Sequence, residues 1–87
     1  MLRRFWFKFS PMPFNALNVG CGVTARDKND AIKLVRELVF ADQHMPGILE
    51  IIEDVDVSAL DSKHVRPNMG TCSGRGIWYP VGFRKPD

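Results

Sequence analysis

One amphipathic stretch constrains the fold of this chain more than any other feature, because it predicts a single main helix. Asp27 is a good N-cap, and Asp30 follows three residues later, where a capping box places an acidic side chain. Apolar residues then recur at helical spacing, at Ala31, Leu34, Val35 and Leu38. The pattern predicts a helix of about 13 residues, roughly 20 Å long, with an apolar stripe that faces the core.

Strand patterns flank this helix on both sides. Residues 5–9 alternate, with phenylalanine rings on one face and Arg4, Trp6 and Lys8 on the other, and an aromatic period of two predicts a strand. Residues 18–24 predict a second strand, in which Gly20 and Gly22 leave space for a close neighbour such as the Trp6 ring. Residues 48–55 predict a third strand, and residues 77–79 a short fourth one.

This order of elements predicts a single α+β domain over residues 1–87. We expect a small antiparallel or mixed sheet of three to four strands in the order β-β-α-β-β, with one main helix packed on one face. A right-handed crossover would make the third strand parallel to the second, either beside it or on the far side of the first. One helix covers only one face, so the C-terminal segment, a second subunit or a ligand must close the other.

The charge is distributed in blocks although the net charge is only +2. Residues 1–26 carry +4, residues 27–61 carry −6 and residues 62–87 carry +4. Such asymmetry can mark a nucleic-acid surface, but we favour basic ends that fold against the acidic middle, because the net excess is small. With two cysteines, no export signal and no long apolar stretch, we expect a cytoplasmic chain that does not enter a membrane.

The spacing of the cysteine and histidine residues does not favour a metal site or a nucleophile with its base. Cys21, His44, His64 and Cys72 are too far apart in sequence to form a compact zinc-ligand pair, so neither a metal nor a cofactor is expected. Cys72 follows His64 by eight residues and could be a nucleophile with its base, but nothing in the sequence orients the histidine. We favour an ordinary loop thiol, and no catalytic residue is predicted.

Two groups of residues are candidates for binding. The C-terminal part contains residue types that are enriched at protein interfaces, namely Arg66, Met69, Arg75, Trp78 and Tyr79. These side chains either contact a partner or cover the small core, and the sequence leaves both alternatives open. Arg4, Trp6 and Lys8 share one strand face, as in a stacking platform for single-stranded nucleic acid. The alternative there is that Trp6 covers the two glycines.

We therefore expect a non-enzymatic protein-binding module of regulatory or inhibitory type, with self-association into a homodimer as one form of partner binding. A nucleic-acid-binding module is the alternative, and a small Cys/His-dependent enzyme is less favoured. The segments IEDVDVSALD (52–61), HVRPNMG (64–70) and RGIWYP (75–80) resemble short bacterial proteins of uncharacterised function. That resemblance implies a bacterial or phage origin and no particular activity.

Overall fold

The fold is built around an antiparallel sheet. The computed structural model describes residues 2–11, 19–41, 44–60, 63, 65–70 and 72–80. Within these residues the strands are β1 (Arg3–Phe9), β2 (Cys21–Ala25), β3 (Ile48–Glu53) and β4 (Gly76–Tyr79), in the order β3-β1-β2-β4. The main helix α1 (Lys28–Leu34) continues into a π-helical turn, η2 (Val35–Val39). Short 3-10 turns, η3 (Val57–Ala59) and η4 (Arg66–Asn68), precede β4. The α+β class and the single main helix are confirmed.

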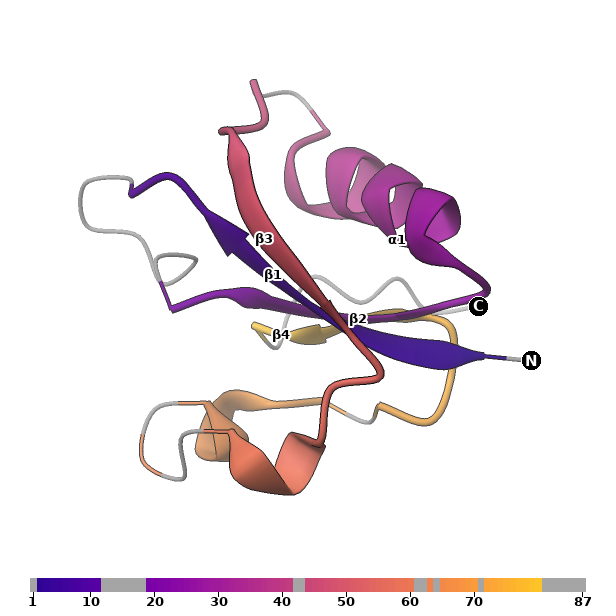
Figure 1. Cartoon of the computed structure of the whole chain (residues 1–87), viewed down its shortest axis with the longest axis vertical. Coiled ribbons are helices and arrows are strands. Elements are labelled where there is room, and N and C mark those ends of the chain that lie inside the picture. The colour runs from indigo at the N-terminus through magenta and orange to yellow at the C-terminus, as the bar shows by residue number, and fades with distance from the viewer. Residues whose placement is uncertain are drawn as a thin grey trace.

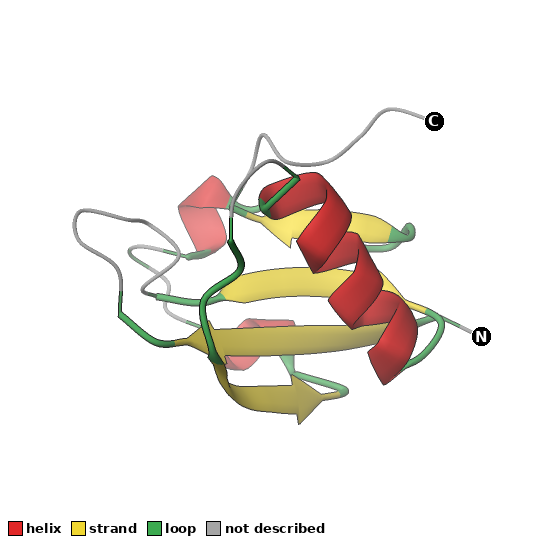
Figure 2. Ribbon diagram, turned by 90° about the horizontal axis from the view of Figure 1, so that it is seen from above, coloured by secondary structure: helices red, strands yellow, loops and turns green. Residues whose placement is uncertain are grey.

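The position of β3 follows the second of the two expected arrangements. β1 pairs antiparallel with β2 on one side and with β3 on the other. β3 therefore runs parallel to β2 on the far side of β1, and it forms one edge of the sheet in Figure 2. β4 pairs antiparallel with β2 and forms the opposite edge among the described strands.

The helix begins where the sequence predicts. The Asp27 carboxylate accepts a hydrogen bond from the Asp30 backbone N–H at 2.8 Å, and the Asp30 carboxylate accepts one from the Arg26 N–H at 3.0 Å. These bonds satisfy N–H groups at the start of the helix, where no intrahelical acceptor exists. Ala31, Leu34 and Val35 are buried, and Leu38 is half-buried. The predicted apolar stripe therefore faces the sheet, which α1 crosses in Figure 2.

The core between α1 and the sheet, here called the helix-side core, consists of phenylalanine and small aliphatic side chains. Phe5, Phe7 and Phe9 project into it from β1, and the Phe9 ring meets Phe40 edge to face at 5.5 Å. Burial raises the pKa of the Cys21 thiol to about 12, so this side chain stays protonated and packs as a small hydrophobe.

A second core lies on the opposite face of the sheet. The chain after β3 passes beneath that face, so Figure 1 shows the sheet between α1 and this irregular segment. Trp6, Val65, Trp78 and Tyr79 are buried there, and the Trp6 ring lies 5.8 Å from Trp78 and 5.5 Å from Tyr79 between centroids. The C-terminal segment, one of the three covers that the sequence left open, therefore packs on this face.

Two glycines of the sheet make room for the tryptophan rings. A Cβ atom at Gly20 would overlap the Trp6 ring, and one at Gly22 would overlap the six-membered ring of Trp78. Gly20 also has a φ of +142°, which side chains rarely adopt. The expected contact with Trp6 is thus confirmed for Gly20, whereas Trp78 from the neighbouring strand β4 occupies the space at Gly22. Among the described residues, no helix has the length and apolar character needed to cross a membrane.

Candidate functional site

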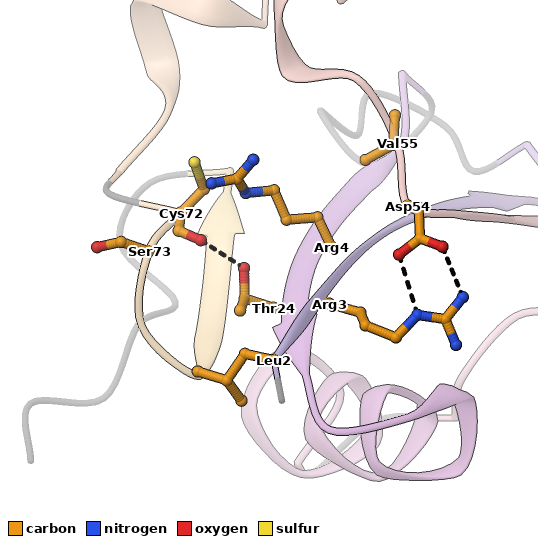
Figure 3. Close-up of a pocket in the computed structure, with 8 residues that line it drawn as sticks. All are labelled: Leu2, Arg3, Arg4, Thr24, Asp54, Val55, Cys72 and Ser73. Carbon is orange, nitrogen blue, oxygen red and sulfur yellow. Dashed lines mark hydrogen bonds and ion pairs between the residues drawn. The ribbon is translucent and has the colours of Figure 1, made fainter.

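A hollow of about 290 Å³ opens where four parts of the chain meet beside the second core. The start of β1, the strand β2, the turn after β3 and the loop before β4 each contribute side chains to it (Figure 3). We call it the Arg4 pocket, and its lining residues are Leu2, Arg3, Arg4, Thr24, Asp54, Val55, Cys72 and Ser73.

Arg3 is fixed at one wall of the Arg4 pocket by two acidic side chains. Its Nε and terminal nitrogen donate to the two Asp54 carboxylate oxygens at 2.9 and 2.7 Å, and Glu53 lies 3.1 Å away. These bonds raise the pKa of the Arg3 guanidinium and lower that of the Asp54 carboxyl. The turn at Asp54 has a positive φ of 55°, a conformation that aspartate tolerates better than most residues. The Arg3 charge is therefore fully engaged.

Arg4 behaves differently from its neighbour in sequence. Adjacent residues of a strand point to opposite faces, and in Figure 3 the Arg4 side chain extends toward Cys72 while Arg3 extends toward Asp54. Arg4 is exposed, and its guanidinium has no hydrogen bond or ion pair within the described part of the chain. Its backbone is held, because the Arg4 carbonyl accepts a hydrogen bond from the Val55 N–H at 3.2 Å. A positioned strand thus presents one cation that no described residue neutralises.

The loop that forms the facing wall is held at both ends. The Thr24 hydroxyl donates to the Cys72 carbonyl oxygen at 2.7 Å. Arg75 donates from two nitrogens to the Asp30 carboxylate at 2.9 and 2.6 Å, which lowers the pKa of Asp30. The loop before β4 is therefore tied to β2 and to the N-terminus of α1.

The outer edge of β3 is a second candidate surface. None of its six residues is buried, and Leu49 is 67% exposed, the most of any large apolar side chain in the described residues. A register shift opposite Lys8 and Phe9 leaves Leu49 at a bulge, without a partner on β1. Glu50 is exposed and lies 3.7 Å from the Lys8 ammonium. By contrast, all four residues of β4 are buried.

The residues predicted to bind a partner fall into two groups. Trp78 and Tyr79 are 0% and 3% exposed, so their burial matches the alternative in which they cover the core. A role in partner contact is not supported for these two, because neither offers surface to a second protein. Met69 is half-buried against the same core, and Arg66 is exposed on η4. Arg75 is partly exposed, but Asp30 engages its guanidinium. A partner role for these last three stays a prediction.

The strand face considered for nucleic acid is divided by the packing. Trp6 is only 4% exposed within the second core, so its ring is not available to stack on a base. Lys8 pairs with Glu50 near the other end of β1, and Arg4 lines the pocket. The alternative in which Trp6 packs over glycine therefore describes this face better than a stacking platform does.

The cysteines and histidines are dispersed as well. Cys21 lies in the helix-side core, Cys72 lines the Arg4 pocket and His44 is exposed, while His64 lies outside the described residues. Within the described ranges, no three His, Cys, Asp or Glu side chains gather as metal ligands would. The Cys72–His64 pair that the sequence raised as the less favoured alternative thus lies partly outside the described residues and stays untested.

Sequence reasoning missed both the Arg4 pocket and the bulged edge. One signal was present in the neighbouring Arg3 and Arg4, which on a strand must point to opposite faces and meet different surroundings. The bulge had no such signal, since it arises from the register of β3 against β1. Comparisons with protein-family models, with curated proteins and with solved structures found no match. The site must therefore be interpreted from its own geometry.

Proposed function

We propose that this chain is a protein-binding module of regulatory or inhibitory type whose partner adds a strand to the outer edge of β3. The observation that carries this proposal is the contrast between the two edge strands: β3 has no buried residue, whereas every residue of β4 is buried. An edge strand presents unpaired backbone N–H and C=O groups, and an extended segment of another protein can pair with them.

The side chains on this edge favour a partner of particular composition. Leu49 offers exposed apolar surface, while the carboxylates of Glu50, Glu53 and Asp54 stay exposed although each pairs with Lys8 or Arg3. Opposite charges and apolar pairs stabilise neighbouring strands, so the best partner is an extended segment in which basic and apolar residues alternate. Self-pairing of β3 would bring the glutamates of two copies together, which is unfavourable. A different protein is therefore a better partner than a second copy.

The test uses synthetic extended peptides in which Lys or Arg alternates with Ile, Val or Leu, and a matched set with Glu in place of the basic residues. Fluorescence anisotropy measures binding to the full chain, and amide hydrogen exchange locates it. We expect the basic set to bind about tenfold more tightly, since two or three cross-strand pairs each contribute a fraction of a kcal/mol. We also expect binding to slow exchange of the β3 amides.

Two variants sharpen this test. Leu49→Lys should weaken binding, because lysine on an edge strand opposes the addition of another strand. Val19→Lys is the matched control, since Val19 is also an exposed large apolar residue but precedes β2. Equal binding of both peptide sets, or protection away from β3, would contradict the proposal. A chain that sediments as a dimer with protected β3 amides would show that the partner is a second copy.

A further inference from the structure

We infer that the Arg4 pocket binds a small apolar monocarboxylate, held through the Arg4 guanidinium. The carboxylate can belong to a free short-chain acid or to the last residue of a peptide. This inference is independent of strand addition at β3, because it rests on a different surface: a hollow of about 290 Å³ that β1, β2, the turn after β3 and the Cys72 loop enclose together.

The charges around the pocket set the charge of the ligand. Asp54 and Glu53 both engage Arg3, so the Arg3 charge is not free to hold a ligand. Arg4 is the lining cation that no described acid neutralises, and it attracts a negative group. A second negative charge on the ligand would have no cationic partner of its own among the described lining residues, because Asp54 and Glu53 engage Arg3. The pocket therefore suits a monoanion better than a phosphate dianion or a nucleic-acid backbone.

The available donors set the shape of the head group. The Thr24 hydroxyl hydrogen is committed to the Cys72 carbonyl, so Thr24 cannot donate to a ligand. The Arg4 guanidinium has five N–H donors in a planar fork, which matches the two oxygens of a carboxylate. A carboxylate thus uses the strongest donor that the described lining residues leave without a partner.

The apolar lining and the volume set the size of the rest of the ligand. Leu2, which is partly exposed, and Val55 give the pocket an apolar side. The volume lies just below the range for ligand pockets, about 300–1,000 Å³, and so suits a ligand smaller than a drug-sized molecule. Covering Leu2 and Val55 with a short apolar chain removes apolar surface from water and adds to the affinity.

The pocket walls are in place before any ligand binds. Arg4 lies in a strand that pairs with β2 on one side and bonds to Val55 on the other. The Cys72 loop is held by Thr24 and, through Arg75, by Asp30. A preformed site loses less conformational freedom on binding, which leaves more of the contact energy as affinity.

The test is an NMR titration of the full chain, labelled with ¹⁵N, using butyrate, acetate, butyramide and inorganic phosphate. We expect butyrate to shift the amide signals of pocket residues such as Thr24 and Val55 in a saturable way. Butyramide, an uncharged analogue of the same shape, should bind about tenfold more weakly or worse, because a charge-assisted hydrogen bond is lost. Acetate should also bind more weakly than butyrate, and phosphate no more tightly.

One variant tests the contact with the carboxylate of the ligand, and another tests the contact with its apolar chain. Arg4→Gln should lower butyrate affinity about tenfold or more. Its native spectrum should be retained, because the Arg4 side chain has no partner among the described residues. Arg36→Gln, at an exposed arginine of η2, is the matched control and should bind as the wild type does. Leu2→Ser should abolish the preference for butyrate over acetate.

Three results would overturn the inference: equal binding of butyramide and butyrate, unchanged butyrate affinity in Arg4→Gln, or phosphate binding about tenfold tighter than butyrate. N-acetylvaline, a mimic of a peptide end, distinguishes the two sources of the carboxylate. Binding at least as tight as that of butyrate would assign the pocket to a chain end, and weaker binding would assign it to a free acid. Neither outcome depends on the peptides used to test β3.

Discussion

One face of the sheet is covered by a regular helix, and the other by an irregular segment with two short 3-10 turns (Figure 1). The helix-side core contains phenylalanine and aliphatic side chains, whereas the second core is built around Trp6, Trp78 and Tyr79. A helix satisfies most of its own backbone hydrogen bonds before it packs. In the described residues of the irregular cover, the backbone hydrogen bonds are those of the single 3-10 turns and one from the Gly70 N–H to the Trp78 carbonyl of β4, so the packing of large rings contributes more to holding it in place.

The two cores also differ in hydrogen bonding. The buried Trp78 indole N–H has no acceptor in the part of the chain that the structure describes. A buried donor without a partner lowers stability by about 1–3 kcal/mol, and no such donor stands out in the helix-side core. The second face therefore derives its stability from ring packing rather than from complete hydrogen bonding.

The largest expected effects come from truncating one ring on each face. Trp78→Ala and Phe7→Ala should each lower the free energy of unfolding by about 3–5 kcal/mol, because both side chains are fully buried. Trp78→Phe should be less harmful than Trp78→Ala, since it keeps a ring and removes the unpartnered N–H. Urea unfolding measures all three. A loss below about 1 kcal/mol for Trp78→Ala would show that the second core does not depend on this ring.

Smaller losses of unfolding free energy are expected for substitutions at the glycines where the second core contacts the sheet backbone. Gly20→Ala and Gly22→Ala should each cost about 1–3 kcal/mol, because the new methyl groups would overlap tryptophan rings. Gly70→Ala is the matched control: its Cβ would approach nothing closer than 3.8 Å, so no comparable loss is expected. Equal stabilities of the three variants in urea would contradict the close ring–glycine contacts.

Local opening should distinguish the two covers under native conditions. The amides of Leu60 and Met69, which make 3-10 hydrogen bonds of 3.2 and 3.4 Å, should exchange about tenfold faster or more than that of Val35 in the helix. The physical reason is that short 3-10 turns can open without unfolding the sheet, whereas α1 packs along its face. Amide hydrogen exchange followed by NMR measures this, and equal protection would show that both covers open together.

The smallest effect concerns the ion pair that links the two regions. Asp30 at the start of α1 accepts both nitrogens of Arg75, so Asp30→Asn should lower stability by about 1 kcal/mol at pH 7. The folded-state pKa of Asp30 lies below its unfolded value of about 3.9. The ionised carboxylate therefore stabilises the fold fully above that pH, and the contribution disappears as the pH falls through the lower, folded value.

This pH dependence is measured by comparing the unfolding free energies of wild type and Asp30→Asn from pH 7 down to about pH 2. The difference should shrink below about pH 4. Glu37→Gln, at an exposed acid of η2, is the control and should change stability little. A difference between wild type and Asp30→Asn that persists at low pH would exclude the Arg75 ion pair as its cause.

The strands, the helix and its N-cap were predictable because each depends on residues close in sequence. The alternation in residues 5–9 and the apolar stripe from Ala31 to Leu38 record which side of an element is buried, whatever it packs against. The sequence also showed that residue types enriched at protein interfaces gather around Trp78. This composition did not distinguish a core from a binding surface, because aromatic residues favour both environments.

The tertiary structure alone decided which surfaces remain free. Arg3 meets Asp54 across 51 positions, Thr24 meets Cys72 across 48 and Arg75 meets Asp30 across 45. No local pattern encodes such pairings, because they depend on strand order and register. These contacts engage Arg3 and leave Arg4 without a partner among the described residues, and the same register places Leu49 at an exposed bulge. The sequence by itself thus determined the elements, and long-range packing determined where this protein can bind.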